Sequence, residues 1–112
     1  MNPLVRMLGR EWIHVRAAII NKKRYYMAHD CCHDLGISNV STAIKSARGV
    51  HNVSQEERTM EQIDEWNKFR TIHLLTLKGV FQLILNNKSG ECRRIKESIA
   101  TVFLSRIRTV AQ

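Results

Sequence analysis

The apolar residues of this 112-residue chain change their spacing from alternation to a helical period, and they do so twice. Residues 11–20 alternate between apolar and polar, which predicts a half-buried β-strand. Polar residues 21–24 and the aromatic, strand-prone residues 25–27 follow, so we predict a β-hairpin with a basic tip. The apolar side of its first strand contains Ile13, Val15, Ala17 and Ile19.

A helix is predicted directly after this hairpin, because apolar residues over 28–35 recur at i, i+3, i+4 and i+7. Gly36 stands where such a helix takes its left-handed C-cap. Ser38 or Asn39 can cap a second helix, which we expect Gly49 to end. Two short helices joined by a glycine turn resemble a helix-turn-helix pair. Their apolar stripes are Ala28, Cys31, Cys32 and Leu35, and then Val40, Ala43, Ile44 and Ala47.

The second half of the chain repeats the order of hairpin and helix. Residues 50–59 are mostly polar and are expected to form a loop. Residues 60–64 and 69–75 predict a second hairpin, which turns around residues 65–68.

Two helices are predicted after the second hairpin. Thr76 can cap the first, which covers 77–86 and ends at a break over 87–90. Its inward side chains are expected to be Val80, Phe81 and Ile84. Ser89 can cap the second, which runs from 91 to 110. Its apolar stripe consists of Cys92, Ile95, Ile99, Val102, Phe103, Ile107 and Val110.

These elements predict one compact α+β domain over residues 1–112, built from two antiparallel hairpins, a helix-turn-helix-like pair and two C-terminal helices. We expect residues 1–10 to be a frayed terminus. No apolar run approaches the roughly 18 residues that span a bilayer. Residues 1–10 also lack the apolar region of a signal peptide. We therefore expect an intracellular protein without a membrane partner.

The charge favours a polyanionic partner, because 18 Lys and Arg against 10 Asp and Glu give a net charge of +8. Residues 1–49 carry eight basic and three acidic residues, and residues 71–112 carry seven and two. Residues 50–70 instead carry three basic and five acidic residues. A DNA-binding surface is therefore expected to come from the two ends of the chain, with the middle facing away.

The three cysteines do not form a plausible disulfide framework, since their number is odd and Cys31 and Cys32 are adjacent. His29 and His33 flank this pair, but the spacing is unlike a zinc motif and both thiols fit the buried stripe. No glycine-rich phosphate loop or activated nucleophile is visible. We expect no metal, no cofactor and no enzymatic activity.

Three segments resemble the Bro-N family, which occurs in baculovirus and phage antirepressor-like proteins. Residues 35–44, LGISNVSTAI, are similar to its Leu-Gly-Tyr-Ser-Asn-Pro-Ser-x-Ala-Ile stretch. Residues 77–85, LKGVFQLIL, and the final helix, with CRRIK and VFLSRIR, follow in the family's order and spacing. The chain departs from the pattern at three positions. Val40 and Ser105 stand where prolines are common, and Ser98 replaces a frequent tryptophan.

The resemblance implies a DNA-binding domain, and the residues offer three groups of candidate contacts. They are the hairpin tip, the polar side of the second short helix and one face of the final helix. Cations can neutralise phosphates, and the hydroxyls can reach phosphates or base edges. For each group the alternative is an ordinary solvated surface. The candidates are Lys22, Lys23, Arg24, Ser41, Thr42, Lys45, Ser46, Arg48, Arg93 and Lys96.

The leading hypothesis is a viral or phage regulator of transcription or replication, in the host nucleus or cytoplasm, that binds double-stranded DNA mainly through phosphates. Single-stranded nucleic acid is a secondary partner, since Tyr25 and Tyr26 could stack on bases if exposed. The rival hypothesis is a protein-interaction module that binds a host or viral protein through the final helix or through Trp12 and Trp66. Homodimerisation is also expected to suit a domain of this size.

Overall fold

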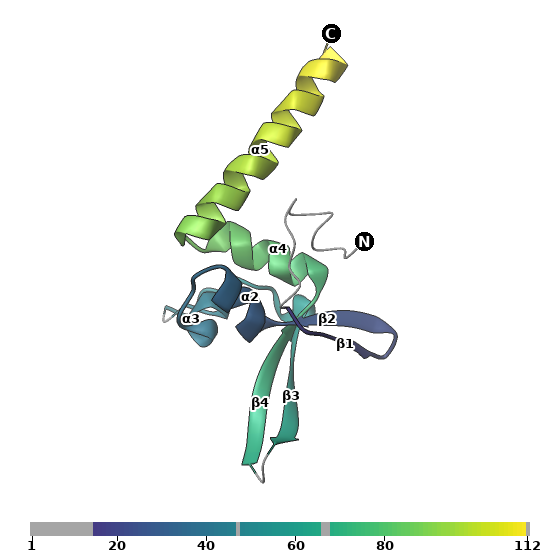
Figure 1. Ribbon diagram of the computed structural model, residues 1–112, viewed down its shortest axis with the longest axis vertical. Helices are drawn as coiled ribbons and strands as arrows, with labels where there is room; N and C mark the ends of the chain where they lie inside the picture. Colours follow the sequence, from purple (N-terminus) through teal and green to yellow (C-terminus); the bar gives the residue numbers. More distant parts are fainter. Residues whose placement is uncertain (1–14, 47, 66–67, 112) are drawn as a thin grey trace.

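The computed structural model describes the backbone of residues 15–46, 48–65 and 68–111, and their side chains except at 63–65, 68–69 and 102–111. This part of the chain folds as one α+β domain in which helices pack around the base of an antiparallel sheet (Figure 1). The predicted fold class is therefore confirmed.

The sheet consists of two hairpins that share very little of their length. Strands β1 (Ala17–Ile20) and β2 (Lys23–Met27) form the first hairpin, and β3 (Arg58–Glu65) and β4 (Lys68–Leu75) form the second. The strand order is β1-β2-β4-β3, and only two residue pairs, at the ends of β2 and β4, join the hairpins. The hairpins therefore leave the body of the domain in different directions (Figure 1).

The first strand differs from the prediction in which of its two sides is buried. The predicted alternation is present, but the side that was expected to face the core is the more exposed one. Ala17 and Ile19 are exposed, whereas Ala18 and Ile20 are half-buried. The reason is that β1 packs mainly against β2 and extends beyond the helices, so the core that buries Tyr26, the partner of Ala17, does not reach Ile19. Of that side only Val15, which precedes the strand, is buried. Residues 11–14 lie outside the described part of the chain.

The first short helix, α2 (Ala28–Asp34), confirms the predicted stripe and its glycine end. Its four apolar residues are all fully buried. Gly36 has a φ of 70°, and its amide donates to the His33 carbonyl at 3.2 Å. The amide of Ile37 donates to the Cys32 carbonyl at 2.8 Å. These two bonds form a Schellman motif, which uses a left-handed residue to satisfy the last carbonyls of a helix.

The second short helix, α3 (Val40–Ile44), begins as predicted but ends sooner than Gly49. Asn39 caps it, with the side-chain oxygen accepting from the Thr42 amide at 3.0 Å. The carbonyl of Ile44 accepts instead from the amides of Asn52 and Val53, at 2.8 and 3.1 Å. That carbonyl is therefore occupied by a distant loop, and the next helical turn does not form. Ala47 lies outside the described residues.

Helix α4 (Leu77–Asn86) matches its predicted bounds and supplies the centre of the core. Its cap is Thr76, whose hydroxyl oxygen accepts from the Gly79 amide at 3.0 Å and donates to the Glu57 carboxylate. Val80 and Ile84 are fully buried as expected. Leu83 is buried as well, while Phe81 is only half-buried.

The final helix, α5 (Gly90–Ala111), begins against α4 and then extends away from the body of the domain (Figure 1). The Ser89 hydroxyl accepts from the Cys92 amide at 3.2 Å, which confirms the predicted cap. Cys92 and Ile95 are buried in the core and Ile99 packs partly against it. The other stripe side chains, from Val102 onward, lie outside the described side chains. Among the described helices, none has the length and apolar character to cross a membrane.

Gly79 allows a close approach between α4 and the turn of 3-10 helix η1 (Gln55–Glu57). A Cβ atom at Gly79 would lie 2.5 Å from the Glu57 carbonyl oxygen. We predict that Gly79→Ala lowers the free energy of unfolding by about 2 kcal/mol, because overpacking outweighs the better helix propensity of alanine. Urea denaturation measures this. Gly90→Ala is the control, since nothing lies within 4 Å of its Cβ position, and it should not destabilise the domain. Equal stabilities of the two variants would contradict the close approach.

Candidate nucleic-acid interface

The tip of the first hairpin is a two-residue turn. Ile20 pairs with Lys23, so only Asn21 and Lys22 connect the strands. Both have positive φ angles, 51° and 65°, as in the type I′ turn that suits the twist of a two-residue hairpin. The predicted four-residue tip is therefore two residues shorter. Lys23 and Arg24 belong to β2.

The basic side chains of this hairpin surround its end. Lys22, Lys23 and Arg24 are all exposed. Because Lys23 and Arg24 are consecutive in a strand, their side chains leave opposite faces of the ribbon. The Lys23 ammonium lies 5.9 Å from the centre of the Tyr25 ring, a weak cation–π contact. Tyr26 is only 2% exposed, so of the two tyrosines only half-buried Tyr25 is open to a ligand.

The residues of the second predicted group do not all lie on one helix, because α3 ends at Ile44. Ser41 and Thr42 are exposed on the helix, as predicted. Lys45, Ser46 and Arg48 were expected on the same helix, but they lie in the loop that follows it. Lys45 forms an isolated antiparallel bridge with His51. The Ser46 hydroxyl accepts from the Val50 amide at 3.2 Å and so helps to close this loop.

Lys96, from the third predicted group on the final helix, lies near the second group on and after α3. The Lys96 ammonium donates to the Asn87 carbonyl at 2.8 Å. The Asn87 amide group donates in turn to the Ala43 carbonyl of α3, at 3.2 Å. Lys96 is thus partly engaged in holding α5 to the α4–α5 connection, whereas Arg93 is exposed. Lys88, an exposed cation in the same connection, was not predicted, although its position in a polar break between helices could have indicated it.

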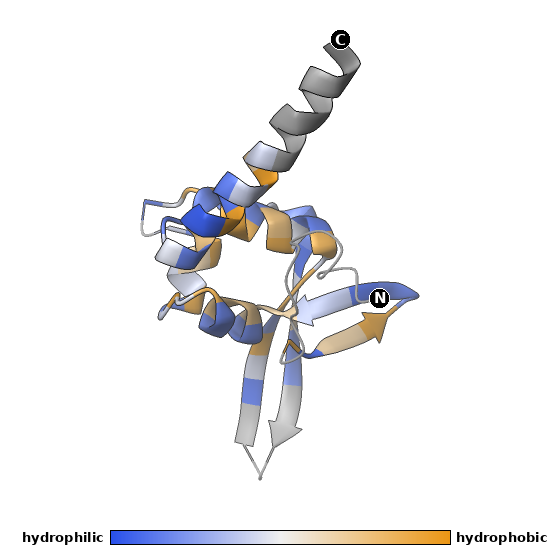
Figure 2. Ribbon diagram, turned by 45° about the horizontal axis from the view of Figure 1, so that its top comes forward, coloured by the Kyte–Doolittle hydropathy of each residue, from blue (hydrophilic) through white to orange (hydrophobic). Residues whose placement is uncertain are grey.

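The basic groups form two surfaces on opposite sides of the domain (Figure 1). We call residues 22–24 the ribbon surface. Lys45, Ser46 and Arg48, which follow α3, and Lys88, in the connection that is hydrogen-bonded to α3, form the loop surface. Both views place the β1–β2 hairpin and α3 at opposite ends of the width of the molecule (Figures 1 and 2). The structure therefore brings Lys96 of the third predicted group close to α3, which carries part of the second group, and places the first group elsewhere.

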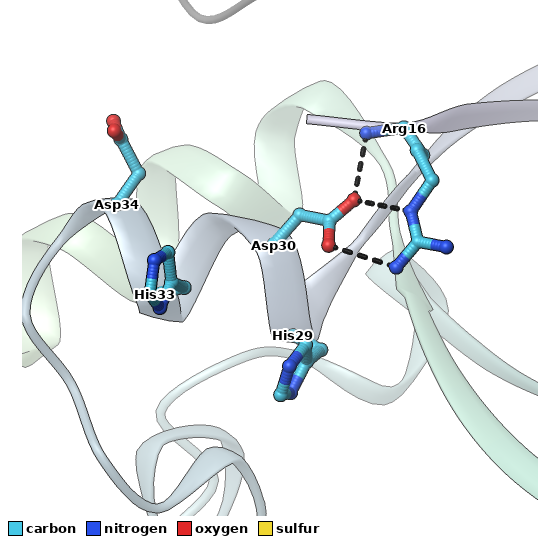
Figure 3. Close-up of a pocket in the computed structure, with 5 residues that line it drawn as sticks. All are labelled: Arg16, His29, Asp30, His33 and Asp34. Atoms are coloured by element: carbon cyan, nitrogen blue, oxygen red, sulfur yellow. Dashed lines mark hydrogen bonds and ion pairs between the residues drawn. The ribbon is translucent and has the colours of Figure 1, made fainter. Parts of the chain in front are cut away.

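The base of the ribbon is attached to α2 by an ion pair, shown in Figure 3. The Arg16 guanidinium donates to both carboxylate oxygens of Asp30, at 2.9 and 3.1 Å. The Arg16 backbone amide donates to the same carboxylate at 2.8 Å. The hydrogen bonds from the Arg16 guanidinium are the main reason why the pKa of Asp30 lies below its usual value, and the one from the backbone amide adds to this effect. Arg16 therefore fixes the start of β1 and is partly neutralised.

An open cavity of about 650 Å³ lies beside this ion pair. Its side chains come from Arg16 and from the outer face of α2, where His29 and His33 point the same way and Asp34 points away (Figure 3). Among the described residues, no three or more His, Cys, Asp or Glu side chains are arranged so that they could hold a metal ion together. The arrangement therefore gives no coordination sphere for zinc in the described part of the chain.

The cysteines of α2 face the opposite way, into the core. Burial raises the pKa of the Cys32 thiol to about 11 and raises that of Cys31 further. Burial thus favours the protonated thiols, whereas the reactive species is the thiolate. Their role in the described structure is packing.

The model of the BRO family N-terminal domain, Bro-N, matches residues 14–105. This match covers most of the chain and includes every strand and helix described above except the end of α5. The chain belongs to the Bro-N family. No curated protein and no solved structure matches it.

The residues that resemble Bro-N motifs have structural roles in this fold. Gly36 forms the left-handed end of α2, and Asn39 caps α3. Gly79 allows α4 to pack against Glu57. The motif segments therefore include turns and close contacts that build the domain. The cations of the ribbon and loop surfaces lie outside these segments, within the matched range of residues 14–105.

The type I′ turn generates a stability prediction. Lys22 occupies a left-handed position that glycine adopts without steric cost. We predict that Lys22→Gly raises the free energy of unfolding by about 0.5 kcal/mol, the strain relief exceeding the added freedom of the unfolded chain. Thermal denaturation of the two proteins measures this gain in stability. Lys23→Gly, inside β2, should destabilise the domain, and a loss of stability from Lys22→Gly would contradict the turn geometry.

The Arg16–Asp30 pair generates a pH prediction. Asp30→Asn should lower the free energy of unfolding at pH 7 by about 1 kcal/mol, a modest value because Arg16 is largely exposed and screened. The lowered pKa of Asp30 stabilises the fold above about pH 4, and this contribution is lost as the pH falls through the folded-state pKa. Urea denaturation from pH 7 to pH 3 should show the two proteins converge. The control is Glu97→Gln, an exposed carboxylate on α5. A constant difference at all pH values would contradict the ion-pair explanation.

Proposed function

We propose that this domain binds double-stranded DNA, mainly through phosphates, as part of a viral or phage regulator of transcription or replication. Membership of the Bro-N family supports a DNA-binding role of this kind. The proposed role is binding without catalysis and without a cofactor. The ribbon surface is the proposed main contact.

The observation that carries this proposal is the charge of the projecting first hairpin. Residues 15–27 contain four basic residues and no acidic residue, and three of the four are exposed at the end of the ribbon. A polyanion can therefore approach the tip without meeting a carboxylate on either strand. The second hairpin carries Glu61 and further acidic residues, and it projects elsewhere (Figure 1).

The shape of the first hairpin supports the same proposal. A two-stranded β-ribbon is narrow enough to enter the major groove of B-DNA, and some β-ribbon proteins place their strands in the minor groove instead. Its cations leave both faces of the ribbon, so they can reach the phosphates on both sides of the groove that it enters. Contacts of this kind position a protein on the duplex without reading its sequence. The expected binding is therefore tolerant of sequence and steeply dependent on salt.

The loop surface is proposed as a second, weaker contact. Lys45, Arg48 and Lys88 are exposed, and the α4–α5 connection that contains Lys88 is hydrogen-bonded to α3 through Asn87 and Ala43. This surface is on the other side of the domain from the ribbon (Figure 1). It either extends the contact along one duplex or binds a separate stretch of DNA.

A salt titration tests the proposal. We expect log K for a short duplex to fall with log salt at a slope near −5 if about six phosphates are neutralised. The double variant Lys22→Gln/Lys23→Gln should reduce the steepness by about 2, because each lost phosphate contact removes about 0.9. Fluorescence anisotropy at several salt concentrations measures both slopes.

A charge-matched variant serves as the control. Lys78→Gln/Arg70→Gln removes two exposed cations from α4 and β4, outside both surfaces. Its slope should equal that of the unchanged protein, since only contacted phosphates contribute. A flat salt response of the unchanged protein, or equal effects of the two double variants, would refute the proposed interface. Lys45→Gln/Arg48→Gln should reduce the slope only if the loop surface binds the same duplex.

A further inference from the structure

The ribbon surface contains an apolar side chain that the phosphate contacts do not use. Ile19 is 69% exposed, more than the other large exposed apolar side chains of the described residues. Leaving an isoleucine in water forgoes about 1.5–3 kcal/mol of burial free energy. Its exposure close to the basic tip leaves it accessible to a ligand.

The register of the hairpin places Ile19 among the cations. It pairs with Arg24, one pair before the turn, so the two side chains share a face of the ribbon. Ala17, the next residue on that face of β1, is small and does not shield it. Figure 2 shows the apolar end of β1 directly beside the hydrophilic turn.

The charge around Ile19 decides what kind of surface can cover it. A second copy of the ribbon would bring the three cations of each tip together, which is repulsive. An acidic surface is required, and it must also offer an apolar slot. Duplex DNA has both features, because its phosphates flank stacked bases. Proteins that bend DNA commonly insert one isoleucine, leucine or proline between base pairs from the minor groove.

We propose that Ile19 is a wedge that inserts between adjacent base pairs in the minor groove while Lys22, Lys23 and Arg24 bind the flanking phosphates. The duplex then bends away from the ribbon, toward its major groove. This inference rests on the proposed function, and it adds a preference for DNA that unstacks easily. Pyrimidine–purine steps such as TA have this property, so they are the expected sites of insertion.

The test uses a duplex of about 25 base pairs with one central TA step. A donor and an acceptor dye at its ends report bending, and 2-aminopurine at the central step becomes brighter when it unstacks. The intact protein should increase both energy transfer and 2-aminopurine fluorescence. Ile19→Ser should abolish both signals and weaken binding about tenfold, without changing the salt slope, because no charge is removed.

Two variants control for effects on the fold. Ile19→Leu keeps an apolar wedge and should retain both signals. Met60→Ser removes a side chain that is 60% exposed on β3, outside the ribbon, and should change neither signal nor affinity. Equal thermal stability of Ile19→Ser and Met60→Ser would exclude unfolding, as expected for exposed positions.

The outcomes separate this inference from the proposed function. Salt-dependent DNA binding without bending or unstacking, or with signals that Ile19→Ser leaves intact, overturns the wedge and leaves the phosphate contacts in place. Absence of DNA binding overturns both. Binding to phosphatidylglycerol vesicles that depends on Ile19, without an unstacking signal on DNA, also overturns the wedge, since a lipid surface would then be its ligand.

Discussion

The junction at Leu75 and Thr76 holds the two hairpins and the helices in one domain. Leu75 pairs with Tyr26 of the first hairpin and with Arg58 of the second, so all four strands meet at this point. The next residue, Thr76, donates its amide to the Glu57 carbonyl at 3.0 Å and caps α4 with its hydroxyl. The two residues Leu75 and Thr76 therefore hold the four strands together, begin α4 and position the segment that leads into β3. The closeness of Gly79 to Glu57 follows from this arrangement.

This junction also determines how the charged surfaces are presented. Because the hairpins share only two residue pairs, the first one is free to extend beyond the core with its cations exposed. The second hairpin, with its acidic residues, leaves in another direction (Figure 1). The small overlap of the two hairpins thus separates a basic ribbon from an acidic one. The Arg16–Asp30 pair then holds the base of the basic ribbon against α2.

The candidate surfaces could be predicted from the sequence only in part. Lys22, Lys23 and Arg24 were predicted at a projecting tip because a basic break between two strand-like segments is a local signal. Lys45, Ser46 and Arg48 were placed on a helix that does not extend to them. Ile19 was assigned to the covered side of β1, because alternation shows that a strand has two faces but does not show which face meets a core.

What the sequence determined by itself is the set of local structures. The caps at Asn39, Thr76 and Ser89, the left-handed end at Gly36 and the stripes of α2 and α4 depend on residues a few positions apart. Their hydrogen bonds and periodicity are therefore visible in the chain. The tertiary structure decided where α3 ends, because Asn52 and Val53 occupy the Ile44 carbonyl. It also decided that Ile19 and the ribbon surface stand clear of the core, since this depends on how far two hairpins overlap, and no local pattern encodes that overlap.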